Sequence, residues 1–369
     1  FDQMSNYFDA FRIDHILGFF RIWSIPAHAV EGIMGRFMPA IPVSINEIFS
    51  KSITFERTRY TEPYVTDSIL IDLFEDKKDE VKKTFFSGLK LKEKFNTQRK
   101  VEAYFKTDKT FDNKIKQGLY DLISNVIFFE VPDSNGQEFH FRFAMQDTYS
   151  FKNLDRHSQK ELTAIYVDYF FHRQDELWKK EAMKKLPGLK SNTAMLVCGE
   201  DLGMVPHCVP EVMEQLGILS LEIQRMPKKT GSEFFHPNDA PYLSVVSPST
   251  HDMSTIRGWW EEDNFKTKHF FNHLMGQNGE PPFYCEAWIN KEIILQHLYS
   301  PAMWSIFQLQ DLMGMNAEIR REDPNEERIN IPAEAEHYWN YRMHINLEDL
   351  LNEKAFTEEL KNYIKESGR

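Results

Sequence analysis

The sequence predicts an α/β fold built from parallel strands. Three short apolar stretches, at 195–198, 219–224 and 243–246, begin at intervals of 24 residues. That interval is typical of repeated strand–helix units. Further strands are predicted at 8–14 and at 303–309. The three evenly spaced stretches therefore belong to one parallel sheet in which helices connect the strands.

The composition is that of a globular protein with an acidic surface. Of 369 residues, 41% are hydrophobic and 27% are charged, and no apolar run is long enough to span a bilayer. The 44 basic and 56 acidic residues give a net charge of −12. Nucleic acids and anionic membranes bind basic surfaces, so the sequence predicts neither as a partner.

The cysteines indicate a reducing compartment. Three are present, an odd number without the spacing of a zinc site, which argues against both a disulfide framework and a metal centre. We therefore expect a cytoplasmic protein. The chain begins at Phe1 and enters a predicted strand almost at once, so we expect a truncated or processed piece of a longer protein, with upstream targeting left open.

The segment between the first two strands has its own pattern. Residues 76–116 are rich in lysine, and their apolar residues recur at helical spacing. The lysines favour a solvated helix face, with a partner-binding surface as the alternative. Residues 126–131 and 138–143 flank a turn at 133–136 and predict a β-hairpin. A long helix follows at 158–184, with Ser158 and Glu161 as a capping box and Pro187-Gly188 at its end.

These patterns divide the chain into four parts. Residues 1–40 form a segment of the α/β domain, and 41–155 form a large insertion, mainly helical with a β-hairpin. Residues 156–345 supply the remaining strands and helices of that domain. Residues 346–369 form a C-terminal amphipathic helix.

Carboxylates follow three of the predicted strands. Asp14, Glu200 and Asp252 each stand at a strand's C-terminal end, and in a (β/α)₈ barrel such side chains converge on one face. Glycoside chemistry uses such a set as nucleophile, general acid/base and stabiliser of the sugar cation. Arg12 shares a strand face with Asp14 and favours its charged form. A structural ion pair and a metal site that includes His15 and His251 are alternatives, and Arg12 disfavours the metal.

Several stretches together resemble a known family, the 4-α-glucanotransferases. These are the amylomaltases or disproportionating enzymes of glycoside hydrolase family 77. The resemblance covers nearly the whole chain outside the insertion, and the ordered set of matches is far more specific than any one motif. The matching stretches are Arg12-Ile13-Asp14-His15, Gly199-Glu200-Asp201-Leu202-Gly203, Thr250-His251-Asp252, Arg257-Gly258-Trp259-Trp260, Leu309-Gln310-Asp311, Arg328-Ile329-Asn330-Ile331-Pro332 and Trp339-Asn340-Tyr341-Arg342.

The resemblance implies a function and roles for individual residues. It makes Asp14 the nucleophile, Glu200 the general acid/base and Asp252 the transition-state stabiliser, and it implies no cofactor. The expected reaction transfers glucosyl or glucan units between α-1,4-glucans by double displacement. The residues that it places at the substrate are Arg12, His251 and Asn330, and Trp23 is a further candidate for stacking on glucose, with core packing as its alternative.

Two departures refine the resemblance. The barrel's earlier strands are absent, so the chain matches the C-terminal part of a (β/α)₈ TIM barrel, from about the fourth strand onward. The insertion is similar to that of the plant cytosolic disproportionating enzyme 2 subgroup, which implies maltose and maltodextrins as donors and glycogen-like glucans as acceptors. The oligomeric state stays open. An α-amylase-like retaining hydrolase and a catalytically silent glycan-binding barrel are the rival interpretations.

Overall fold

The chain folds into two compact units. A computed structural model describes residues 2–229 and 231–369. The first unit contains the chain up to residue 17 together with 186–205 and 209–369, and the second contains 18–185 and 206–208. The second unit thus includes residues 18–40 and 156–185 besides the segment 41–155. The predicted domain boundaries stay predictions.

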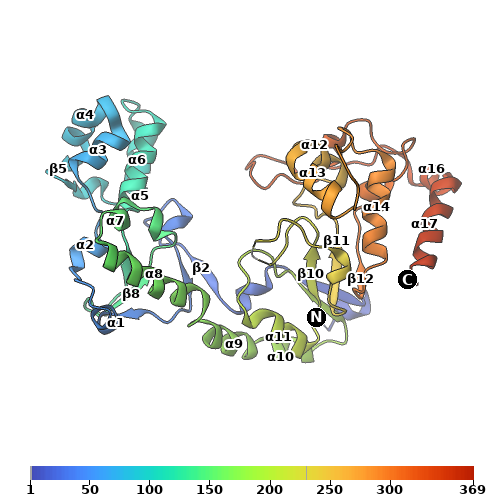
Figure 1. The fold of residues 1–369 in the computed structure, drawn as a ribbon, viewed down its shortest axis with the longest axis horizontal. Helices are drawn as coiled ribbons and strands as arrows, with labels where there is room; N and C mark the ends of the chain where they lie inside the picture. The colour runs from blue at the N-terminus through green and yellow to red at the C-terminus, as the bar shows by residue number, and fades with distance from the viewer. Residues whose placement is uncertain (1, 230) are drawn as a thin grey trace. The chain divides into compact units, whose positions relative to one another are not determined.

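Among the residues that the structure describes, five parallel strands follow one another in chain order through the first unit. β1 pairs with β9, and β10, β11 and β12 pair in sequence. A parallel bridge between Cys198 and Leu219 joins β9 to β10. The predicted parallel α/β arrangement is therefore confirmed, and Figure 1 shows β10, β11 and β12 side by side. The strand bounds are β1 Ala10–Ile13, β9 Leu196–Gly199, β10 Ser220–Ile223, β11 Ser244–Ser247 and β12 Trp304–Ser305.

Apolar alternation explains why these stretches are strands. Leu219, Leu221, Ile223 and Val245 form one buried cluster, as expected when every second side chain points to the same face. β12 is shorter than the predicted 303–309, because a helix already begins at Leu309. The helices of this unit are α10 Leu186–Ser191, α11 Cys208–Leu216, α12 Ile256–Glu262, α13 Asn264–His273, α14 Ala287–Leu298, α15 Leu309–Met313, α16 Leu347–Asn352 and α17 Lys354–Glu366.

Aromatic residues hold the helices after β11 together. Trp260, Phe270 and Ile289, from α12, α13 and α14, lie in one core cluster and are fully buried. The C-terminal helix predicted at 346–369 is two helices, α16 and α17, which meet at Glu353. Phe356 of α17 packs into a further buried cluster with Met313.

The second unit confirms the predicted hairpin. β7 and β8 pair antiparallel, with Phe128 opposite Phe141, and β4 pairs with the other edge of β8. Phe128, Phe139 and Phe141 are fully buried, so the hairpin contributes its aromatic face to the core. The strand bounds are β2 Ile22–Ser24, β3 Arg36–Met38, β4 Val43–Ser44, β5 Phe86–Ser87, β6 Lys90–Leu91, β7 Phe128–Glu130 and β8 Glu138–Phe141.

A helical cluster makes up much of this unit. Figure 1 shows α3, α4, α5 and α6 packed together, and Val81, Phe85 and Val101 are fully buried among them. These are positions at which helical spacing predicted an apolar face. The helix bounds are α1 Ile45–Ser50, α2 Arg57–Thr61, α3 Asp67–Phe74, α4 Lys78–Phe85, α5 Gln98–Thr107, α6 Asn113–Ile123, α7 Tyr149–Lys152, α8 Arg156–Phe171 and α9 Asp175–Met183.

The predicted helix 158–184 is wrong in three details. It begins earlier, because the carboxylate of Asp155 caps α8 by accepting from the backbone N–H of Ser158 at 3.0 Å. Ser158 is therefore not the cap, and its hydroxyl donates to Asp155 at 2.6 Å. The helix also breaks after Phe171, and α9 begins at Asp175. Pro187-Gly188 does not end a helix but lies in the first turn of α10, where a missing N–H costs nothing.

Candidate active site

The ends of β1 and β9 bring two of the predicted carboxylates together. Ile13 lies opposite Gly199 in the parallel register, so Asp14 and Glu200 are the next residues on two adjacent strands. The backbone N–H of Glu200 donates to the carbonyl of Ile13 at 2.9 Å, and the N–H of Ile16 donates to the carbonyl of Glu200 at 3.0 Å. Adjacent strands lie about 4.8 Å apart, so the two residues are neighbours at one strand edge.

Asp14 is open to solvent and paired with Arg12. A guanidinium nitrogen of Arg12 donates to Oδ1 of Asp14 at 2.9 Å, which confirms that the two side chains share a strand face. The Asp14 side chain is 86% exposed. One carboxylate oxygen is thus held by a cation while the group stays accessible to a ligand.

Glu200 is held more tightly than Asp14. Its side chain is only 16% exposed, and Oε2 accepts the backbone N–H of His15 at 2.8 Å. The imidazole of His15 also faces this carboxylate, with Nδ1 3.9 Å from Oε2. His15 has φ 46°, in the left-handed region that residues other than glycine rarely adopt. This backbone conformation directs an N–H from the residue after Asp14 onto the carboxylate of Glu200.

Asp252 lies in the loop that follows β11. Its Oδ1 accepts from the side-chain amide of Asn330 at 2.7 Å, and Nε2 of His251 lies 3.4 Å from its Oδ2. Asn330 is 9% exposed, so its amide can orient the carboxylate from within the protein. The structure therefore brings together Asp252, His251 and Asn330, although Asp252 and Asn330 are 78 positions apart in the sequence.

Buried and partly buried hydrogen bonds hold the loop that follows β11 and carries Asp252. The amide of Gln308 donates to Oγ of Ser249 at 2.6 Å and to the carbonyl of Thr250 at 3.0 Å. Oγ of Ser249 also donates to the carboxylate of Asp311, which accepts the N–H of Ile256 at 2.7 Å. Burial raises the pKa of Asp311. Gln308 has no predicted role, because it falls inside the strand predicted at 303–309, whereas β12 ends at Ser305 and leaves Gln308 in the loop that follows.

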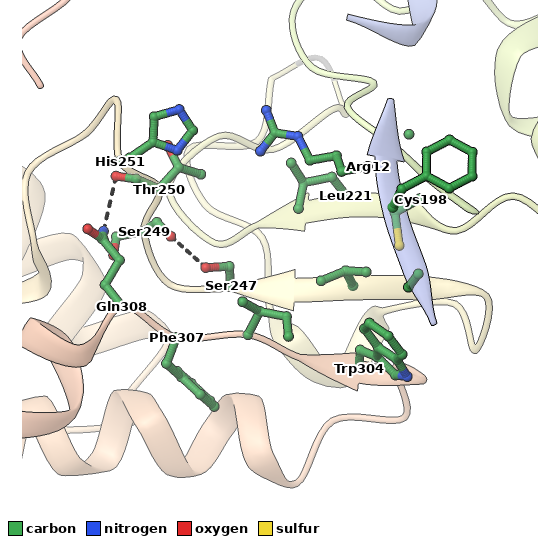
Figure 2. A pocket seen from close by; sticks show the side chains of 15 residues that line it. Arg12, Cys198, Leu221, Ser247, Ser249, Thr250, His251, Trp304, Phe307 and Gln308 are labelled. Atoms are coloured by element: carbon green, nitrogen blue, oxygen red, sulfur yellow. Dashed lines mark hydrogen bonds between the residues drawn. The ribbon is translucent and has the colours of Figure 1, made fainter. Parts of the chain in front are cut away.

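A cavity opens over the inner side of the strands. Its volume is about 350 Å³, within the usual range of ligand pockets. Figure 2 shows Thr250 and His251 beside one another on its wall, with the hydrogen bonds of Ser247 and Gln308 drawn as dashed lines. Arg12 and His251 contribute to the lining, whereas the three carboxylates do not.

Trp23, the candidate for stacking on glucose, and Trp259, from the matched stretch 257–260, both pack against other aromatic rings. Trp23 belongs to the second unit, where its Nε1 donates to the carbonyl of Gly32 at 2.9 Å and its ring meets Phe37 at 4.7 Å. Trp259 is 8% exposed and packs on Phe270 at 5.1 Å. Both contacts favour the core-packing interpretation.

The described residues contain neither a cluster of metal ligands nor a membrane-spanning helix. Among residues 2–229 and 231–369, no group of three or more His, Cys, Asp or Glu side chains is arranged to hold a metal ion. In the same described residues, no helix has the length and apolar character required to cross a membrane.

Comparison with known proteins identifies the relatives of this chain. A family model for glycoside hydrolase family 77, described as 4-alpha-glucanotransferase, matches residues 1–348. The 4-alpha-glucanotransferase DPE2 of Oryza sativa subsp. japonica is 39% identical over 378 residues, which cover 100% of this chain and 40% of the rice protein. The 4-alpha-glucanotransferase of Chlamydia trachomatis is 28% identical over 214 residues, or 57% of this chain and 37% of that protein.

Among solved structures, this chain is similar to an amylomaltase from Streptococcus agalactiae in complex with acarbose. It is 21% identical, with a TM-score of 0.38, and the match covers 53% of this chain and 35% of that chain. The chain spans about two fifths of the length of the rice relative. Its family match extends across both units, from the Asp14 strand to beyond the Asn330 segment. The chain therefore belongs to glycoside hydrolase family 77, the 4-alpha-glucanotransferases.

Proposed function

We propose that the protein is a retaining 4-α-glucanotransferase in which Asp14, Glu200 and Asp252 carry the chemistry. The observation that carries the proposal is the register of β1 and β9, which makes Asp14 and Glu200 neighbours at one strand edge. Retaining enzymes need a nucleophile and an acid/base that are close enough to act on the same glycosidic bond. The exposed Asp14 and the enclosed Glu200 match these two roles.

The reaction proceeds in two displacements. An oxygen of Asp14 attacks the anomeric carbon while Glu200 gives its proton to the glycosidic oxygen, so the donor's reducing-end part leaves with a free hydroxyl. The product of this step is a covalent glycosyl-aspartate. A hydroxyl of the acceptor glucan then gives its proton to Glu200 and attacks the same carbon, which releases Asp14. Asp252, oriented by Asn330, stabilises the positive charge on the sugar in both transition states.

The finer features of the proposal rest on the family resemblance. We propose maltose or maltodextrins as donors and glycogen-like glucans as acceptors, a (β/α)₈ barrel to which β1 and β9–β12 contribute from about the fourth strand onward, and a cytoplasmic location. The free thiols of Cys198, Cys208 and Cys285 support a reducing compartment.

A matched pair of assays tests the function in the full-length protein. Maltose is supplied with and without glycogen, and free glucose is followed together with total reducing ends. Transfer exchanges one glycosidic bond for another, so glucose rises while total reducing ends stay constant. Reducing ends that rise with glucose would show that water is the acceptor, and the protein would be a hydrolase.

The variant Asp14→Ala tests the nucleophile. It is expected to lower turnover by about 10³-fold or more and to leave glycan binding largely intact, because Asp14 lies on the surface and supports no core contact. A variant that keeps the wild-type rate would refute the mechanism. A wild-type protein that binds glucans without turnover would instead be a silent glycan-binding barrel.

A further inference from the structure

An exposed tryptophan stands next to the candidate active site. Trp339 is 60% exposed, and its ring centroid lies 5.1 Å from that of His251, with the two planes inclined by 45°. Single exposed apolar side chains are common on protein surfaces, so the contact of Trp339 with His251, and not its exposure alone, singles out this residue. Trp339 belongs to the stretch 339–342 that resembles the family, and the resemblance implies no role for it.

The segment that carries Trp339 is attached to the site at both of its ends. It begins at Asn330, whose amide donates to Asp252 at 2.7 Å. It then turns back, since Nε2 of His337 lies 3.0 Å from the carbonyl of Ile329. Two residues later, Trp339 reaches His251. Adjacent residues of one loop, His251 and Asp252, therefore hold the start and the end of the segment 330–339.

The indole is thus held by its contact with His251, and 60% of the side chain stays exposed. The packing against His251 places the ring beside the group that would hold the reactive sugar. The indole combines a wide apolar face with a polar N–H, which suits contact with the apolar C–H face of a pyranose. Such stacking of an indole on a sugar ring contributes to binding without hydrogen bonds to the sugar hydroxyls.

We propose that Trp339 is a stacking platform for a glucosyl ring of the bound α-1,4-glucan, next to the ring that reacts. This inference rests on the proposed function for the identity of the ligand. It makes Trp339 a residue that determines affinity for longer glucans, whereas the chemical step belongs to the carboxylates. The variant Trp339→Ala should therefore weaken binding and leave the chemical step nearly unchanged.

The kinetic test compares three variants of the full-length protein with maltoheptaose as substrate. Trp339→Ala is expected to raise KM about tenfold, which corresponds to about 1.4 kcal/mol at 25 °C, while kcat changes less than about threefold. Trp339→Phe keeps an aromatic face and should restore most of the affinity. Trp288→Ala is the matched control, because Trp288 is also exposed, at 40%, and its ring contact is with Phe271.

A binding measurement separates this inference from the proposed function. Maltoheptaose is titrated into Asp14→Ala and into Asp14→Ala/Trp339→Ala, and the two dissociation constants are compared. Weaker binding by the double variant supports the platform even if the wild-type protein shows no transfer. An active enzyme in which Trp339→Ala changes neither KM nor this binding would overturn the platform and leave the function standing. A fall in kcat with an unchanged KM would also overturn it.

Discussion

The buried ion pair between Arg257 and Glu327 supports the segment that leads to the site. Their side chains are 5% and 2% exposed, and a guanidinium nitrogen of Arg257 donates to the carboxylate of Glu327. The same guanidinium nitrogen donates to the carbonyl of Arg321 at 2.8 Å. Glu327 also accepts from the hydroxyl of Thr255 at 3.0 Å. The pair thus joins α12 to η8 (Pro324–Glu327), three residues before Asn330.

The variant Arg257→Leu should destabilise the first unit strongly. It leaves the carboxylate of Glu327 buried without its cation, and breaking a buried pair in this way costs about 3–5 kcal/mol. The loss should depend on pH. Burial raises the pKa of Glu327, and Arg257 opposes that rise, so the variant's pKa is higher still. A pKa raised by folding gives stability that is present at low pH and lost as pH rises through the folded value.

The free energy of unfolding in urea, measured at pH 7 and at pH 5, tests both statements. The penalty of Arg257→Leu should be smaller at pH 5, where the carboxyl of Glu327 takes up a proton more readily. The double variant Arg257→Leu/Glu327→Leu should recover much of the loss at pH 7, because it leaves no buried charge. The surface pair of Arg99 and Glu102 supplies a control, for which Arg99→Leu should change little. A penalty under about 1 kcal/mol at pH 7, or an equal penalty at both pH values, would refute the reasoning.

Three more predictions concern the site and the second unit. His15→Gly should keep most of the transferase rate, whereas His15→Val should lower it about tenfold. A β-branched residue resists the positive φ at position 15, which directs the backbone N–H to Glu200. Equal transferase rates of the two variants would contradict this prediction. The transferase rate should be highest for the wild type, lower for Asn330→Ala and lowest for Asn330→Asp. The Asn330→Asp variant places a second carboxylate against that of Asp252. A fully active Asn330→Asp would argue against the hydrogen bond between Asn330 and Asp252. Burial lowers the pKa of His140 to about 4, so the unfolded chain takes up a proton first and the second unit should lose stability as pH falls from 6.5 toward 4. His140→Gln should reduce the difference between urea midpoints at pH 7 and pH 5, and an unchanged difference would speak against this assignment.

The sequence by itself determined the local features of the protein. Short apolar runs located the strands, and period-two alternation placed Arg12 and Asp14 on one face, as their 2.9 Å contact confirms. Apolar spacing located the helical cluster, and the turn at 133–136 located the hairpin. These features depend on residues that are close in the chain, so a short window of sequence contains the information that specifies them.

Only the tertiary structure decided how distant residues meet. The N–H of His15 reaches Glu200 across 185 positions, and Asn330 reaches Asp252 across 78. Such contacts depend on strand register and on the paths of loops, which local patterns do not encode. The same reason explains why Trp339 meets His251, 88 positions away in the sequence. The sequence therefore named the candidate reactive groups, and long-range packing arranged the residues that contact them.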